Sequence, residues 1–120
     1  MEKTEKDVER YLCQCVKKLG GKAYKFVSPG NAGVPDRLVV VPTGADKTIT
    51  AIYLLVEVKK PGGKLRPQQR MKIKELCDMG ADCRIVDSYD RVDKVIMELE
   101  TAVAAAAFIA AELSGAVKNG

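Results

Sequence analysis

The sequence predicts an α/β fold in which helices pack around a mixed β-sheet. Apolar residues recur at helical spacing near both ends and in the middle of the chain, and runs of mostly β-branched residues lie between them. The resulting order is helix, three strands, helix, strand, helix, which favours helices covering a sheet. At 120 residues the chain has the size of one domain, and its 47% hydrophobic and 30% charged residues are typical of a soluble globular protein.

The first helix is predicted over residues 4–20. Thr4 can cap its start, with Asp7 at the capping-box position, and two glycines end it. Glu5 lies at the edge of the expected apolar face, and Glu9 flanks that face one turn later. The simplest interpretation of Glu5 is a first-turn acid that the helix dipole favours. The apolar face consists of Val8, Leu12, Cys15 and Leu19.

Three strands are expected next, within residues 22–28, 36–41 and 50–59. Residues 29–33 form a loop by composition, and its glycines let the backbone approach another group closely. Residues 42–47 form a turn, so the second and third strands should pair antiparallel as a hairpin.

Two further helices are expected around a short strand. A basic, breaker-rich loop at residues 60–67 precedes a helix over about 68–79, and a strand over 82–86 precedes a helix over 90–99. The expected buried side chains of the first of these helices are Met71 or the stem of Lys72, then Leu76 and Met79. The apolar face of the second consists of Val92, Val95, Ile96 and Leu99.

The C-terminal segment is almost entirely alanine over residues 101–111. Alanine is the best helix former, so this segment can prolong the last helix to about Leu113. It is too short to cross a bilayer, which needs about 20 apolar residues. We therefore divide the chain into a domain at residues 1–100 and an Ala-rich helix with a frayed tail at 101–120, and expect the helix to pack on the domain or on a second copy.

Histidine is absent, which excludes Ser-His-Asp and Cys-His mechanisms and leaves the chemistry to carboxylates, lysines, thiols and hard metal ions. The N-terminal residues lack the apolar core of a secretory signal, so a cytoplasmic location with free thiols is expected. The cysteines are Cys13, Cys15, Cys77 and Cys83, and their spacing is not that of a standard zinc site. The net charge of +4 is a mild indication of a polyanionic partner.

Charged residues lie where buried strands should carry none. Asp36 opens the second strand, and Glu57 and Lys59 end the third, two residues apart and therefore on one face. Two carboxylates close together repel each other, and a divalent cation such as Mg²⁺ or Mn²⁺ relieves that repulsion. A bound cation activates water and a nearby ammonium can hold a phosphate, so the set suits phosphodiester hydrolysis. The simpler alternative is a structural salt bridge, from Glu57 to Lys59 or from Asp36 to Arg37.

These residues resemble a known nuclease signature. Gly33-Val34-Pro35-Asp36 followed by Glu57-Val58-Lys59 is similar to the motif of PD-(D/E)xK nucleases. The details resemble the small stand-alone phage and bacterial members of the VRR-NUC subgroup: the leading helix with its Glu, Gly20-Gly21, Ser28-Pro29-Gly30, Pro61-Gly62-Gly63-Lys64 and Pro67-x-Gln69. The resemblance covers about residues 4–96 and implies a restriction-endonuclease-like core with the Ala-rich helix as an addition.

The resemblance implies a Mg²⁺- or Mn²⁺-dependent DNA endonuclease. Asp36 and Glu57 would hold the metal together with the carbonyl of Val58, and Lys59 would be the catalytic lysine. The helix-one glutamate of the family corresponds best to Glu5, with Glu9 as the alternative. Its downstream glutamine corresponds to Gln69, with Gln68 one residue off the pattern.

The resemblance also implies substrates and partners. Stand-alone members resemble Holliday-junction resolvases and act as homodimers, so branched DNA is the expected substrate. Phosphate contacts are expected from basic residues that follow the site and from two that flank it, because such contacts fix position without reading sequence. These residues are Lys60, Lys64, Arg66 and Arg70, with Lys22 and Lys25 at the flank. The alternatives are a sequence-specific restriction-type enzyme, a non-catalytic DNA-binding module and a purely structural interaction protein.

Overall fold

The computed structural model describes residues 2–44 and 51–119 and has the predicted α/β architecture. Its elements in chain order are α1 (Glu5–Lys18), β1 (Lys22–Lys25), β2 (Arg37–Pro42), β3 (Ala51–Val58), α2 (Pro67–Asp78), β4 (Cys83–Val86) and α3 (Tyr89–Asn119). The four strands form one sheet in the order β1-β2-β3-β4. The first three are antiparallel and β4 is parallel to β3, so the sheet is mixed as expected.

The hairpin of β2 and β3 is confirmed, and it sets the register of the sheet. Arg37 lies opposite Val56 at one end, and Pro42 lies opposite Ala51 at the other. Pro42 therefore belongs to the strand rather than to the turn expected at 42–47, and residues 45–47 of that turn lie outside the described residues. Parallel pairing of β3 with β4 requires a crossover connection, which α2 and its loops provide.

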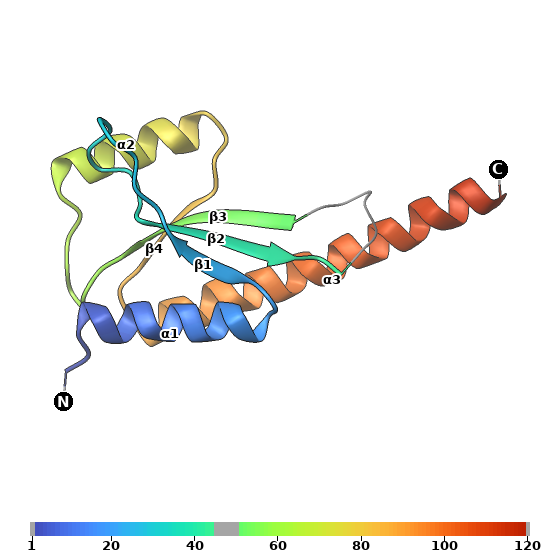
Figure 1. Cartoon of the computed structure of the whole chain (residues 1–120), viewed down its shortest axis with the longest axis horizontal. Coiled ribbons are helices and arrows are strands. Elements are labelled where there is room, and N and C mark those ends of the chain that lie inside the picture. Colours follow the sequence, from blue (N-terminus) through green and yellow to red (C-terminus); the bar gives the residue numbers. More distant parts are fainter. Residues whose placement is uncertain (1, 45–50, 120) are drawn as a thin grey trace.

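α1 and α3 lie together on one side of the sheet, and α2 lies on the other side (Figure 1). The capping box of Thr4 and Asp7 is confirmed, with bonds of 2.8 and 3.2 Å between each backbone N–H and the other residue's side chain. The fully buried stripe of α1 is Val8, Leu12 and Val16. Cys15 and Leu19, which were expected in this stripe, are only half-buried, because the 3.6-residue period turns Val16 toward the sheet.

β1 is shorter than predicted. It ends at Lys25 instead of reaching residue 28, although the Phe26 N–H still donates to the Asp36 carbonyl at 2.7 Å. Val27 is 73% exposed, and Pro29 has no N–H to continue the ladder. The loop that follows can therefore leave the sheet and reach α2.

The predicted burial of α2 is confirmed only in part, because Leu76 and the alternative Lys72 are half-buried whereas the methionines are not. Met71 and Met79 are 72% and 71% exposed, whereas the polar Gln69 is 6% exposed. The first turn of α2 packs against the loop before β2, so a polar residue is buried at that contact.

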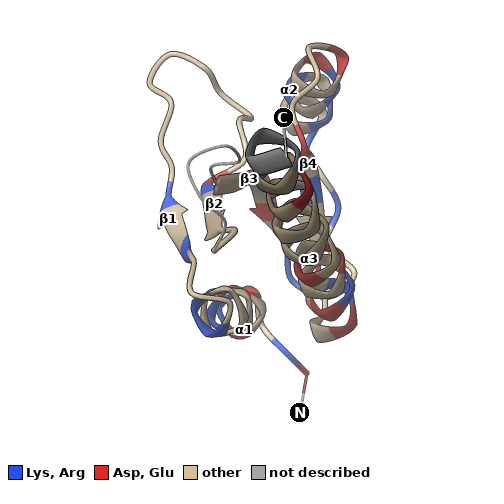
Figure 2. Ribbon diagram, turned by 90° about the vertical axis from the view of Figure 1, so that its right-hand side faces the viewer, with Lys and Arg blue, Asp and Glu red and all other residues tan. Residues whose placement is uncertain are grey.

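α3 confirms the predicted apolar face, with Val92, Val95 and Leu99 buried and Ile96 partly buried against the core. It continues as one helix to Asn119, beyond the expected end near Leu113, and projects past the sheet (Figure 1). The domain boundary between residues 100 and 101 falls inside this helix and stays a prediction. Figure 2 shows that charged residues are frequent on the three helices and also occur on the strands, for example on β1. Within residues 2–44 and 51–119, no helix combines the length and apolar character that crossing a bilayer requires.

Candidate active site

Asp36 and Glu57 face each other at one end of the β2–β3 hairpin. Arg37 pairs with Val56, so the next step of the same antiparallel register sets Asp36 opposite Glu57. Directly opposed residues point to the same face of a sheet. Val56 and Val58 are buried in the core on the α1 side, so alternation along β3 turns Glu57 toward α2.

The Glu57 carboxyl is buried at 6% exposure. Its pKa is raised to about 7, mainly by burial and also by the nearby Asp36 and Glu5 charges, while Lys59 and Arg66 act in the opposite direction. Asp36 Oδ1 is also buried and has no hydrogen-bond partner. Two acids crowded at one point, with an unpartnered oxygen between sheet and helix, form a site that attracts a cation.

The loop before β2 and the first turn of α2 close this site. Gly33 has φ +92°, and a Cβ there would lie 2.4 Å from the Gln68 carbonyl oxygen, so only glycine allows this approach. Gln69 Oε1 accepts from the Arg66 N–H at 2.8 Å, which fixes the buried amide. The cavity between them has a volume of about 260 Å³, and its lining includes Asp36, Glu57, Arg66, Gln68 and Gln69.

Glu5 and Glu9 have different environments. Arg37 points to the α1 side because its neighbour Asp36 points to the α2 side. Its guanidinium is 13% exposed and donates to Glu9 Oε1 at 2.7 Å and to the Ala23 carbonyl at 3.1 Å. Glu9 is therefore part of a structural ion pair. The exposed Glu5, at the start of α1, is the helix-one acid whose charge acts on Glu57.

Lys59 follows β3, and its N–H donates to the Val86 carbonyl at 2.9 Å, which extends the ladder by one residue. Neither of the salt bridges considered from the sequence, Glu57 to Lys59 or Asp36 to Arg37, is among the ion pairs of the described residues. Asp36 Oδ2 instead lies 3.7 Å from Lys25 Nζ. This contact is long and exposed, so it contributes little to stability.

The basic residues expected to contact phosphate are not all equally close to the cavity. Arg66 lines it. Arg70 Nη1 donates to the Leu65 carbonyl at 3.0 Å and so orders the loop before α2. Lys60 and Lys64 are exposed on the loop after β3. Lys22 lies over the Tyr24 ring, with its Nζ 4.8 Å from the ring centroid.

The donor set fits a hard divalent cation. In the described residues, no group of three or more Asp, Glu, Cys or His side chains could hold a metal ion, and the four cysteines are free. Asp36 and Glu57 offer two carboxylates, which is the number that Mg²⁺ commonly takes from a protein while keeping several waters. The unpartnered Asp36 Oδ1 is a hard oxygen that such an ion would satisfy.

Comparison with known proteins agrees with this geometry. The model of the VRR-NUC domain matches residues 2–90. The chain belongs to the VRR-NUC family. It is 43% identical over 86 residues to "Putative nuclease p44" of Acyrthosiphon pisum secondary endosymbiont phage 1, with 72% of this chain and 85% of the relative covered. A solved "VRR_NUC domain" matches with a TM-score of 0.65 and 31% identity, covering 78% of this chain and 94% of that one.

The VRR-NUC match ends soon after α3 begins, so most of α3 lies beyond it. Within the match, sequence reasoning missed the ion pair of Arg37 with Glu9. The available signal was the charge of Arg37 in an otherwise apolar strand. From the sequence, Asp36 was considered as the partner of Arg37. Strand alternation excludes that pairing, because neighbouring side chains point to opposite faces.

Glu57→Gln should stabilise the metal-free protein at high pH. Between pH 4.5 and about 7 the unfolded chain ionises Glu57 while the folded chain keeps it protonated, so stability falls as pH rises. The difference between the pKa of Glu57 in the unfolded chain and its pKa in the folded chain corresponds to a free energy of about 3 kcal/mol. Urea unfolding in EDTA should show the variant more stable than the wild type at pH 8, by up to about that amount, and similar to it at pH 4. Glu100→Gln, an exposed control, should change stability by less than about 0.5 kcal/mol. A Glu57→Gln protein that is less stable at pH 8 would contradict the proposed burial cost.

Proposed function

We propose that this VRR-NUC protein is a Mg²⁺- or Mn²⁺-dependent DNA endonuclease that hydrolyses phosphodiester bonds and prefers branched DNA. The observation that carries this proposal is the pairing of the buried Glu57 with Asp36, whose buried Oδ1 has no partner, beside a cavity lined by Arg66 and Gln69. The nuclease named among its phage relatives supports the same reaction class.

Asp36, Glu57 and the Val58 carbonyl would hold the ion. When bound, it supplies an activated water and stabilises charge on a phosphoryl oxygen. Lys59 shares the face of Glu57 and would orient the water or hold the phosphate. Gln69 is fixed by its bond to the Arg66 backbone and would hold Arg66 and the first turn of α2 against the scissile phosphate. Glu5 would stabilise the ion through its charge at the edge of the site.

The preference for branched DNA is supported by the kind of DNA contacts that the basic side chains can make. Arg66 lines the cavity, Arg70 lies on the first turn of α2, and Lys60 and Lys64 are exposed on the loop after β3. All four can bind phosphates without reading bases. The described residues contain no helix-turn-helix or other base-reading motif that would favour sequence-specific cleavage. DNA shape is therefore the basis of selection in this proposal.

A homodimer in the cytoplasm completes the proposal. Two cuts across a four-way junction need two sites, which a two-fold dimer supplies. The part of α3 beyond the sheet carries apolar side chains that a second copy could cover: Phe108, Ile109 and Leu113, which are 66%, 48% and 45% exposed. A reducing compartment suits four free cysteines.

Cleavage should require metal and the paired acids. We expect the wild type to cut a synthetic four-way junction faster than a flap or a linear duplex in Mn²⁺ or Mg²⁺, with paired cuts across the junction and no cleavage in EDTA. Asp36→Asn and Lys59→Ala should lower the rate at least about 100-fold. Asp90→Asn, an exposed control at the start of α3, should cut normally.

Junction binding without cleavage by the wild type in either metal would identify a non-catalytic DNA-binding module, and equal cleavage by Asp36→Asn and the wild type would contradict the role of Asp36. Cutting at one short sequence in linear duplex would identify the restriction-type alternative.

Glu5 and Glu9 should be separable by substitution. Glu9→Gln should lower the unfolding free energy by about 1–2 kcal/mol, because the half-buried Arg37 loses its carboxylate, and should leave cleavage largely intact. Glu5→Gln should unfold like the wild type but cut about 10- to 100-fold more slowly, as residues that support metal ligands do. Urea unfolding and junction cleavage would be measured for both variants. Loss of cleavage in Glu9→Gln at unchanged stability would reverse the assignment.

A further inference from the structure

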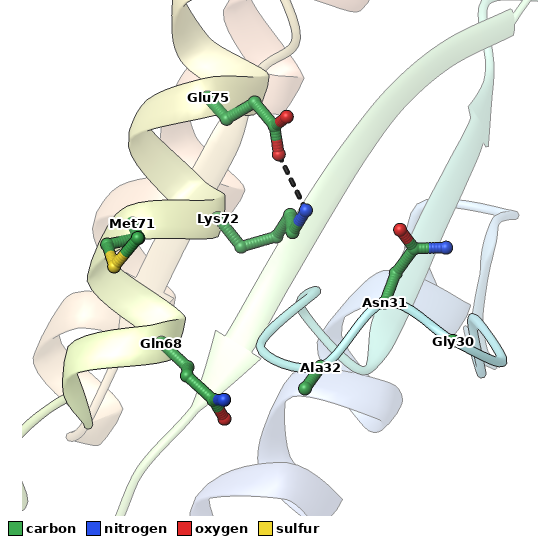
Figure 3. A pocket seen from close by; sticks show the side chains of 7 residues that line it. All are labelled: Gly30, Asn31, Ala32, Gln68, Met71, Lys72 and Glu75. Atoms are coloured by element: carbon green, nitrogen blue, oxygen red, sulfur yellow. Dashed lines mark ion pairs between the residues drawn. The ribbon is translucent and has the colours of Figure 1, made fainter.

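A second cavity adjoins the candidate active site, between the loop before β2 and the face of α2 that is turned toward this loop (Figure 3). Its volume is about 590 Å³, within the range of about 300–1,000 Å³ that small-molecule sites have. Ala32 and Gln68 line both this cavity and the cavity of the paired acids. A DNA strand held at the acids can therefore continue directly into this groove.

The groove lacks the character of a phosphate site. Its one cation, Lys72, is paired with Glu75 at 2.7 Å and is 25% exposed, so its charge is balanced. Phosphate sites use unpaired Lys and Arg, and Glu75 would repel a phosphate. The sugar–phosphate backbone is better held by the basic residues around the acids.

Carboxamides give the groove the chemistry of a base-binding site. Asn31 Nδ2 donates to Ser28 Oγ at 3.2 Å and to the Pro29 carbonyl at 3.3 Å, which leaves its Oδ1 directed toward the Lys72 side of the groove (Figure 3). The amide of Gln68 reaches toward the loop from the opposite wall. Asparagine and glutamine offer a donor and an acceptor together, which is the pattern on the edges of bases.

Met71 supplies an apolar surface on the α2 side of this otherwise polar groove. It is 72% exposed, and Lys72, the alternative to Met71 for burial at this turn, is the more buried of the two. On the loop side of the groove, Gly30 borders open space, since a Cβ there would meet nothing within 4 Å. Methionine is one of the side chains that DNA-binding proteins insert between base steps to unstack them.

We propose that this groove receives one unstacked base of the DNA, next to the phosphate that is cut. Asn31 and Gln68 contact the edge of the base, and Met71 covers its face. The proposal rests on the proposed nuclease function and deepens it, because removing a base from the stack costs least where it is already unpaired. Branched DNA would be preferred for that reason.

The test uses four-way junctions that each contain one 2-aminopurine, a base whose fluorescence rises when it is unstacked. The 2-aminopurine is placed in turn at each of three positions on either side of the branch point. The full chain is added in Ca²⁺, and binding is followed by anisotropy on the same samples. We expect fluorescence to rise at one position or at two adjacent positions with the wild type. Met71→Ala should abolish the rise. Asn31→Ala should reduce it and weaken binding about 2- to 10-fold, the range of one hydrogen bond.

Gln14→Ala is the matched control, because Gln14 is an exposed amide on α1, away from the groove. It should leave both readings unchanged. All three substituted residues are exposed, so thermal unfolding should match the wild type.

The groove proposal is overturned if the fluorescence rises at none of the positions. It is also overturned if the rise persists in Met71→Ala and Asn31→Ala. Failure of the nuclease function is seen separately, in Mn²⁺. If no junction is cut there but the fluorescence behaves as expected, the groove remains a base-binding site and the nuclease proposal fails. If cutting is normal and no base unstacks, only the groove proposal fails.

Discussion

The cost of burying the Glu57 carboxylate is the constraint on which the rest of this structure depends. β3 lies between β2 and β4, and its neighbours Val56 and Val58 fill the core on the α1 side. Alternation along the strand therefore leaves Glu57 on the α2 side, beneath the first turn of that helix. A buried carboxylate needs a partner, and the nearest side chain across the hairpin is another acid, Asp36. The fold thus holds two like charges in a position that a cation would relieve.

The ion pair that stabilises the fold and the acids of the candidate site lie on opposite faces of the sheet. On the α1 side, Arg37 and Glu9 form an ion pair that joins the sheet to α1. On the α2 side, Asp36 is left with a buried oxygen that no described group satisfies. Asp36 and Arg37 are neighbours in sequence, yet their side chains lie on opposite faces of the sheet, because successive side chains of a strand point to alternate faces. α2 covers the acids with a fixed amide instead of an apolar face, so the site remains open to a polar ligand.

Local patterns made most of the fold predictable from the sequence. The cap at Thr4, the hairpin of β2 and β3, and the buried face of α3 each depend on residues close together in the chain. The motif also indicated that Asp36 and Glu57 would meet. The errors involve distant contacts: Gln69 rather than Met71 is buried at the first turn of α2, because the Gly33 loop, and not an apolar surface, packs there. The choice between Glu5 and Glu9 likewise depended on Arg37, which no helical pattern reveals.

The central claim is that the paired acids hold a divalent cation, and anomalous diffraction from a crystal grown with Mn²⁺ tests it most directly. The account predicts one manganese peak in contact with Asp36, Glu57 and the Val58 carbonyl, and no peak there in a crystal of Asp36→Asn grown in the same way. Wild-type crystals with manganese elsewhere and none between these two carboxylates would contradict it.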